Sequence, residues 1–104
     1  MQRGWVYILE CADSTYYTGS TANLQSRLAQ HEAGVFPASY TVRRRPVKLV
    51  WAEECSDIRD AIAAEHQIKG WSHKKKWALI EGRFDLLHEY AQSKEMRARR
   101  AINK

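Results

Sequence analysis

A lone carboxylate is the first side chain in this sequence with the potential for chemistry. Glu65 lies in a segment with helical periodicity and, at about 100° per residue, shares one narrow arc with Ile58 and Ile62. A carboxylate on an apolar face costs several kcal/mol unless it is paired or bound to a metal. An ion pair with Lys69, one turn further on, is the structural explanation. The functional one is a metal site, because Mg²⁺ and Mn²⁺ often bind only one or two protein carboxylates.

Two tyrosines are the second such feature. Tyr7 and Tyr17 lie in segments 5–11 and 15–18, whose β-branched and aromatic residues favour strands. Residues 12–14 between them, Ala-Asp-Ser, favour a turn. A three-residue loop makes the two tyrosines diagonal neighbours on one face of a hairpin, whereas a two-residue turn would put them on opposite faces. We predict the three-residue loop, and with it a pair of hydroxyls on one face.

An arginine and a histidine are the third. Arg27 and His31 are four residues apart in a segment, residues 22–33, that the spacing of Leu24 and Leu28 predicts to be a helix. Side chains four apart are neighbours on a helix surface. Both border the apolar stripe, so we expect them where the helix leaves the core and meets solvent.

The elements that must position these residues form a small α+β pattern. We expect a three-stranded antiparallel sheet flanked by helices, in the order β-β-α-β-α-α with an extra C-terminal helix. Cap and stop residues place the elements after the first hairpin: a helix 22–33 with Thr21 or Asn23 as cap and Gly34 as stop, a loop 32–45, a strand 47–52, a helix from Ser56 or Asp57 to Lys69, a helix 73–81 between Ser72 and Gly82, and a helix 84–91. Residues 1–92 are predicted to form one domain, and residues 93–104 a basic tail that frays.

Composition bounds the class of protein. A chain of 104 residues with 44% hydrophobic residues supports one packed core. No apolar stretch approaches the ~20 residues of a membrane span, and the start of the chain lacks a signal region, so we expect a cytoplasmic protein that does not enter membranes. The net charge is +5, but five basic residues and one acidic residue lie from residue 94 onward. The overall charge is therefore weak support for an anionic partner.

Short motifs in a fixed order carry a resemblance to a known family. They are Trp5-Val6-Tyr7-Ile8, Tyr17-Thr18-Gly19, Asn23-Leu24, Arg27-Leu28-x-x-His31, Glu65 and Lys69. In order and spacing, over residues 4–81, they resemble the GIY-YIG nuclease superfamily. The small size is similar to its compact stand-alone bacterial branch, whose members are often described as predicted endonucleases.

The resemblance implies a metal-dependent endonuclease that hydrolyses phosphodiester bonds in nucleic acid, with DNA as the expected partner. It implies one divalent ion, Mg²⁺ or Mn²⁺, on Glu65, and a glycine, Gly19, that closes the second strand. It also implies that one tyrosine is a general base or positions the attacking water and that the arginine steadies the phosphate; the catalytic set is Tyr7, Tyr17, Arg27 and His31. A tyrosine titrates near ~10 when unperturbed, so Arg27 and the metal would have to lower the pKa of a tyrosine base.

Basic residues are candidates for holding the nucleic acid backbone without sequence preference, with steep salt dependence. A run of charge is also what an ordinary solvated surface shows. No segment indicates a base-reading helix, so any sequence specificity would be weak or come from an unidentified protein partner. The candidates are Arg43, Arg44, Arg45, Lys69, Lys74, Lys75 and Lys76.

Two departures from the family pattern keep other functions open. Trp5 replaces the glycine of the first motif, and the asparagine that larger members carry in a later helix is missing, since the only asparagine after Asn23 is Asn103. The missing asparagine favours a nucleic-acid-binding module that keeps the fold but does not cleave. An interaction or scaffold domain that keeps only the fold is the other alternative.

Overall fold

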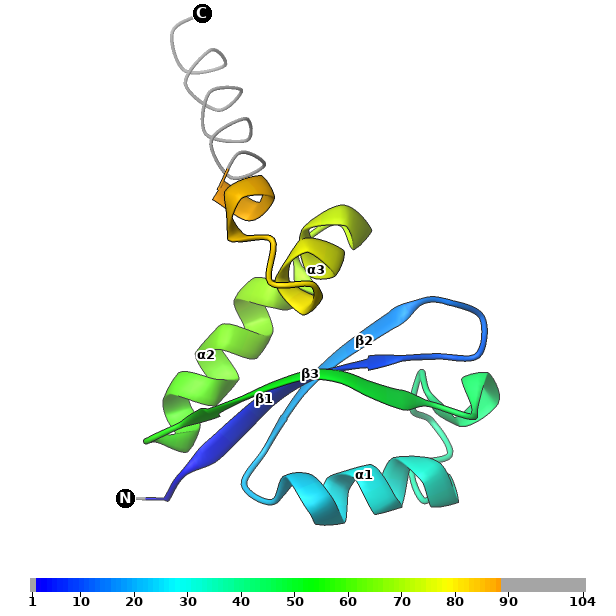
Figure 1. Cartoon of the computed structure of the whole chain (residues 1–104). Helices are drawn as coiled ribbons and strands as arrows, with labels where there is room; N and C mark the ends of the chain where they lie inside the picture. Colours follow the sequence, from blue (N-terminus) through cyan, green and yellow to red (C-terminus); the bar gives the residue numbers. More distant parts are fainter. Residues whose placement is uncertain (1, 89–104) are drawn as a thin grey trace, which may run out of the picture. The chain divides into compact units, whose positions relative to one another are not determined.

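The computed structural model describes residues 2–88 of the chain. The described residues fall into two compact units, divided between Trp71 and Ser72. The elements in order are β1 (Gly4–Glu10), β2 (Tyr16–Thr21), α1 (Leu24–Ala33), a 3₁₀ turn (Val42–Arg44), β3 (Lys48–Cys55), α2 (Ile58–Lys69) and α3 (His73–Ile80) (Figure 1). The predicted domain end at residue 92 and the tail 93–104 lie outside the described residues.

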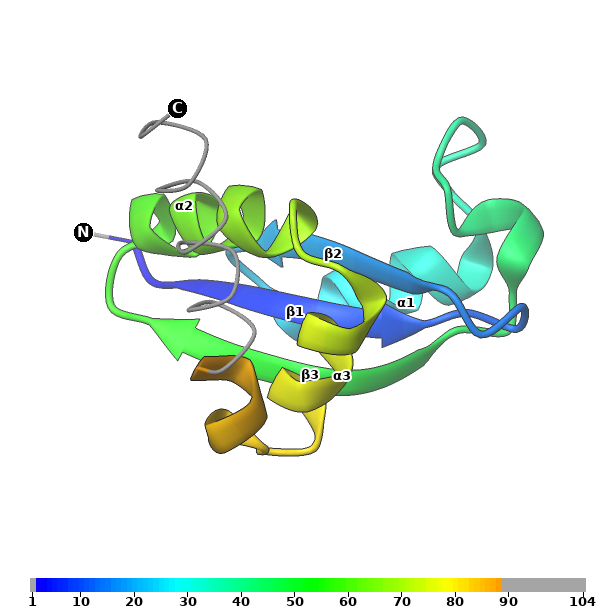
Figure 2. The same cartoon turned by 90° about the horizontal axis from the view of Figure 1, so that it is seen from above.

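The sheet of the first unit has three antiparallel strands in the order β2-β1-β3, so β1 is central and both neighbours are edge strands. Figure 2 shows β2 and β3 on either side of β1. Val6, Ile8 and Leu9 of β1 are at most 1% exposed and form the centre of the core. The predicted fold class, α+β with a three-stranded antiparallel sheet flanked by helices, is confirmed.

The β1–β2 hairpin has the predicted three-residue loop. Leu9 pairs with Tyr17, and the backbone N–H of Cys11 donates to the carbonyl of Thr15 at 2.9 Å. The loop is stabilised by Asp13, whose carboxylate accepts from the backbone N–H and the hydroxyl of Thr15. With this register Tyr7 and Tyr17 lie on the same face, as the sequence predicted.

The sequence predicted that β2 would end at Gly19, but the strand continues to Thr21. Gly19 pairs directly with Tyr7, whose ring and hydroxyl lie across it. A Cβ at Gly19 would be 2.5 Å from Cζ of Tyr7 and would also collide with the hydroxyl oxygen. The glycine is therefore explained by close approach of a side chain, and not by the end of the strand.

Strand β3 is also longer than the predicted 47–52, because Glu53, Glu54 and Cys55 continue the pairing with the start of β1. Exposed charges such as Glu53 and Glu54 are common on an edge strand. A register shift opposite Ile8 and Leu9 places one extra residue, Val50, in β3. Such a bulge bends the edge of a sheet locally.

Helices α1 and α2 cover opposite faces of the sheet (Figure 1). Side chains alternate along a strand, so Trp5 and Tyr7 face one side and Gly4 the other. Tyr7 contacts His31 of α1, whereas a Cβ at Gly4 would meet Ile58 of α2. The two helices therefore approach the sheet from different sides.

The ends of α1 follow the predicted chemistry. The side chain of Asn23 caps its start by accepting from the backbone N–H of Ser26, and Gly34 ends it in the left-handed conformation at φ 68°. This fixes which side chains of α1 face the sheet.

Helix α2 begins after its cap residue Asp57, but its apolar stripe is not the predicted one. Ala61 and Ile68 are its buried residues, and Ile62 is 41% exposed. Glu65 is one turn from Ala61 and one turn from Ile68, so it lies on the buried face, with its side chain 14% exposed. Ala61 lies against the start of β1, where a Cβ at Gly4 would be 3.1 Å from the Ala61 Cβ.

In the second unit, α3 is capped by Ser72, whose hydroxyl accepts from the backbone N–H of Lys75. Residues 84–88 are helical, which is the described part of the predicted helix 84–91. Among the described residues, no helix has the length and apolar character needed to cross a membrane.

Candidate active site at the edge of the sheet

Tyr7 is the centre of the candidate site. Its side chain is 1% exposed, and a hydrogen bond of 2.9 Å joins its hydroxyl to Nε2 of His31 on α1. The ring also packs at 6.5 Å from the ring of Tyr17, measured between centroids. A strand residue and a helix residue 24 positions apart are thus held in direct contact.

The sequence predicted that His31 would border solvent, but the residue is buried, at 2% exposure. The segment after α1 covers it: Nδ1 of His31 lies 3.0 Å from the hydroxyl of Thr41, which is in turn 3.1 Å from the hydroxyl of Ser39. Burial, with a smaller effect of the nearby Arg27 guanidinium, lowers the pKa of His31 below its usual value. His31 is accordingly a neutral imidazole at neutral pH.

Tyr17 lies where residues from both helices meet. Its ring centroid is 5.3 Å from that of His31 on α1 and 5.9 Å from Nζ of Lys69 on α2. The ring of Tyr40 stacks on it at 6.4 Å with an interplanar angle of 18°. Tyr17 of β2 thus has one neighbour from each helix, His31 of α1 and Lys69 of α2.

Arg27 acts on both members of the Tyr7–His31 pair. Its positive charge lowers the pKa of each of them. Its guanidinium sits 5.2 Å from the ring centroid of Phe36. This contact holds a cation at the edge of the site, where it can bind an anion.

Glu65 also acts on Tyr7, since its negative charge raises the pKa of the phenol. Its side chain is 14% exposed, and its oxygens lie 3.6 Å from Nζ of Lys69 and 3.7 Å from Nε2 of His66. Residues 2–88 contain no group of three or more His, Cys, Asp or Glu side chains placed to hold an ion. One half-buried carboxylate fits Mg²⁺ or Mn²⁺, which take hard oxygen ligands and keep several water molecules, and does not fit a structural zinc.

The pKa of Tyr7 is raised well above its ordinary value, mainly by burial and next by Tyr17. Arg27 lowers it, as expected from the sequence, but does not offset burial. The lowered pKa that a tyrosine base would need from Arg27 and a metal together is thus not supplied by the protein residues alone. Tyr7 is a neutral phenol at neutral pH.

The arginine run is largely occupied within the protein. Arg44 donates to Asp13 and to the carbonyl of Tyr40, and its guanidinium lies 3.7 Å from the Tyr40 ring centroid. Arg45 donates to the carbonyls of Val42 and Glu32. Both arginines tie down the segment that covers His31, which gives them a structural role.

The other predicted backbone contacts are distributed over both units. Arg43 is exposed, and within the described part of the chain its side chain has no hydrogen bond or ion pair. Lys69 lies at the site, beside Glu65 and Tyr17. Lys74, Lys75 and Lys76 belong to α3 in the second unit, where Lys74 is exposed and the other two are half-buried.

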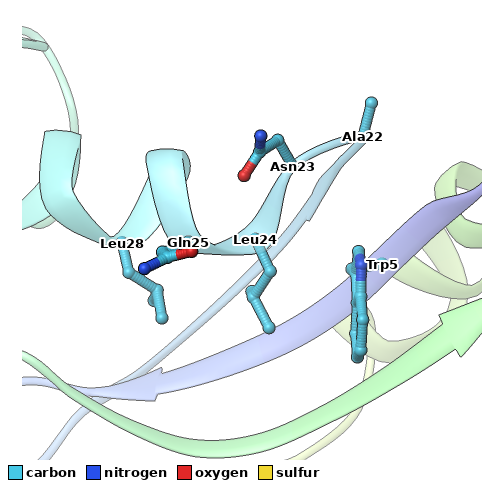
Figure 3. Close-up of a pocket in the computed structure, with 6 residues that line it drawn as sticks. All are labelled: Trp5, Ala22, Asn23, Leu24, Gln25 and Leu28. Carbon is cyan, nitrogen blue, oxygen red and sulfur yellow. The ribbon is translucent and has the colours of Figure 1, made fainter.

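A separate apolar hollow of about 430 Å³ lies at the start of α1. In Figure 3, Trp5 stands on β1 opposite Leu24 of α1. None of the predicted site residues lines the hollow, whose walls are Trp5, Ala22, Asn23, Leu24, Gln25 and Leu28. The candidate site is thus the cluster around Tyr7.

The sequence did not reveal the side chains of the segment 36–41. Thr41, Tyr40 and Phe36 contact His31, Tyr17 and Arg27 respectively. The sequence indicated only a loop there, and no local periodicity marks these positions. The nearest available signal was their polar and aromatic character within a segment otherwise rich in turn residues.

Comparison with known proteins shows the family of the chain. Residues 3–78 match the model of the GIY-YIG catalytic domain. The chain is 46% identical to a UPF0213 protein of Syntrophus aciditrophicus over 78% of this chain and 93% of that protein. It is 43% identical to a UPF0213 protein of Staphylococcus haemolyticus over 80% of this chain and 100% of that protein.

A solved structure supports the fold. The solution NMR structure of a UPF0213 protein from Bacillus halodurans is 35% identical, with a TM-score of 0.50, and the match covers 76% of this chain and 83% of that one. The motif order, the site geometry and the match over most of the chain lead to one conclusion. The chain belongs to the GIY-YIG family, in a group with the small UPF0213 proteins.

Proposed function

We propose that this chain is an endonuclease that hydrolyses phosphodiester bonds in DNA with one divalent metal ion. The observation that carries the proposal is the convergence on Tyr7. A neutral imidazole is hydrogen-bonded to its hydroxyl, and the charges of Arg27 and Glu65 both act on the same phenol. Membership of a family defined by a nuclease-type catalytic domain supports it.

A relay through Tyr7 supplies the base. Because burial raises the pKa of Tyr7, a preformed phenolate is not available at neutral pH. The attacking water instead gives its proton to the Tyr7 oxygen while the phenolic proton passes to Nε2 of His31, 2.9 Å away. The water oxygen bonds to phosphorus and the bond to the leaving oxygen breaks. Each proton then has a defined acceptor.

The remaining residues stabilise charge and hold the substrate. Arg27 would donate charge-assisted hydrogen bonds to a non-bridging phosphate oxygen. Glu65 would hold the ion, which when bound stabilises charge on the phosphate and the leaving oxygen. Exposed cations such as Arg43, Lys69 and Lys74 are candidates for contacts with the nucleic acid backbone.

The experiment incubates supercoiled DNA, branched DNA and a structured RNA with wild type, Tyr7→Phe and Glu65→Gln in Mg²⁺, Mn²⁺ or EDTA. Gln67→Ala is the matched control, because Gln67 is exposed on the same helix as Glu65. We expect Tyr7→Phe to lower turnover by about 10²–10⁴ and to leave the Kd for DNA nearly unchanged. Glu65→Gln should abolish both cleavage and the stabilisation of the fold by Mn²⁺.

Three outcomes would contradict the proposal. Equal turnover in Tyr7→Phe removes Tyr7 from the mechanism. DNA binding without cleavage by wild type, in either metal, shows a binding module that does not cut. If wild type neither binds nucleic acid nor gains thermal stability from Mn²⁺, the chain keeps the fold for another purpose.

A further inference from the structure

The partner of His31 on the side away from Tyr7 is a buried threonine. Thr41 is 1% exposed, and its hydroxyl lies 3.0 Å from Nδ1 of His31. The hydroxyl of Ser39 is 3.1 Å from the Thr41 hydroxyl. The side chains of Tyr7, His31, Thr41 and Ser39 thus form a row of four hydrogen-bonding groups. The relay from Tyr7 gives Thr41 no proton to transfer, so its contact with His31 needs a different explanation.

The direction of the hydrogen bonds follows from the role of Tyr7 in the relay. There the Tyr7 hydroxyl donates to Nε2 of His31, its partner within the described residues; with the proton on Nε2 the phenol oxygen would accept instead. Nε2 is then unprotonated. Because His31 is neutral, its one proton is on Nδ1 and is donated to Thr41, which donates in turn to Ser39.

The threonine is itself held in place. Tyr40, between Ser39 and Thr41 in the chain, stacks on Tyr17 and lies under the guanidinium of Arg44. Arg44 also binds the Tyr40 carbonyl and the carboxylate of Asp13 in the β1–β2 turn. The covering segment is thereby fixed at both the hairpin and β2, which keeps the Thr41 oxygen facing Nδ1.

From this geometry we propose that Thr41 is a positioning residue that keeps the proton of His31 on Nδ1. Nε2 is then always free to accept from Tyr7. A neutral histidine side chain without such a partner carries its proton mainly on Nε2, where it could not accept from Tyr7. Only the kinetic part of the test rests on the proposed endonuclease activity.

The direct test is the tautomer, measured by long-range ¹H–¹⁵N NMR of ¹⁵N-histidine-labelled protein at neutral pH. The spectrum of His31→Gln assigns the His31 signals. In wild type we expect the pattern of a neutral ring with the proton on Nδ1, and in Thr41→Val a shift of most of the population to Nε2. Thr41→Ser keeps the hydroxyl and should keep the wild-type pattern.

Thr18→Val is the matched control. It removes another buried threonine hydroxyl, which has no hydrogen-bond partner among the described residues, so the His31 signals should not change. A wild-type spectrum with the proton on Nε2 overturns the proposal without any substitution. So does an unchanged tautomer in folded Thr41→Val.

A kinetic readout separates this proposal from the proposed function. On DNA, Thr41→Val should lower kcat by about tenfold or more with KM little changed, a smaller loss than the ~10⁴ seen when a charged partner of a catalytic histidine is neutralised. The correct tautomer in a protein that does not cleave refutes the endonuclease and leaves the assignment of Thr41. Cleavage at the full rate by Thr41→Val refutes the role of Thr41 and leaves the endonuclease.

Discussion

Gly19→Ala is the substitution that most directly tests how Tyr7 is held. The added Cβ would be 2.5 Å from Cζ of Tyr7 and 3.0 Å from Cε1, and it would collide with the hydroxyl oxygen. Tyr7 has no room to retreat, because it is 1% exposed and its ring lies against those of Tyr17 and His31. Relief of the clash therefore breaks the hydrogen bond to His31 or displaces β2.

The size of the effect follows from three contributions. Overpacking a buried site costs about 1–3 kcal/mol. Loss of the Tyr7–His31 hydrogen bond adds about 0.5–1.5 kcal/mol. Removing the flexibility of glycine from the unfolded chain returns about 0.4–1 kcal/mol. We expect a net decrease of about 1–3.5 kcal/mol in the free energy of unfolding, measured by urea denaturation with an unchanged m value.

Gly70→Ala is the control, because a Cβ there has only an ordinary contact of 3.5 Å with the carbonyl of Gln67. It should leave stability unchanged or slightly raised. In a Tyr7→Leu background the ring atoms are gone, so Gly19→Ala should cost much less there than in wild type. If Gly19→Ala is as stable as wild type, or costs the same in both backgrounds, the contact between Gly19 and Tyr7 does not restrict this position.

The other predictions concern charge. Arg44→Ala should lower the free energy of unfolding by about 1–2 kcal/mol, because it removes the Asp13 pair and the Tyr40 contact. Arg43→Ala should leave stability unchanged and reduce the salt dependence of DNA binding by about one unit of log–log slope. Equal stabilities of the two variants would contradict the structural role of Arg44. The pKa of His31 is lowered in the folded state. The contribution of neutral His31 to stability is therefore complete above pH ~6.5, the ordinary pKa of histidine, and is lost as the pH falls from there through the folded pKa. Acid titrations of wild type and His31→Gln should diverge in that range, and cleavage by wild type should fall with protonation of His31. Because the pKa of Tyr7 is raised, wild type should lose stability as pH rises above ~10, and Tyr7→Phe should lose less. Parallel curves of stability against alkaline pH for the two proteins would show that Tyr7 is not the group responsible.

Local chemistry made much of the fold predictable. The three-residue turn depends on Asp13 and its neighbours, and it alone fixes that Tyr7 and Tyr17 share a face. Helix α1 begins after Asn23 and ends at Gly34 because capping uses atoms three or four residues apart. These interactions lie within a few residues of one another, so the sequence contains all of their partners.

Other features were decided only when distant segments met. Burial of His31 depends on the segment that carries Thr41, and the raised pKa of Tyr7 depends on both helices and two strands. Gly19 looked like the end of a strand until the ring of Tyr7 was seen to lie across it.

By itself, then, the sequence determined the order of the strands and helices and the hairpin register, and it identified the residue types that could hold a metal or bind a phosphate. The tertiary structure decided which of them are buried, which are hydrogen-bonded to each other and which only hold the fold. The physical reason is that propensity, capping and turn chemistry act over a few residues, whereas desolvation is produced by whatever part of the chain covers a group. Arg43 and Arg44 are adjacent in the chain, yet only Arg44 is bound to Asp13 and Tyr40.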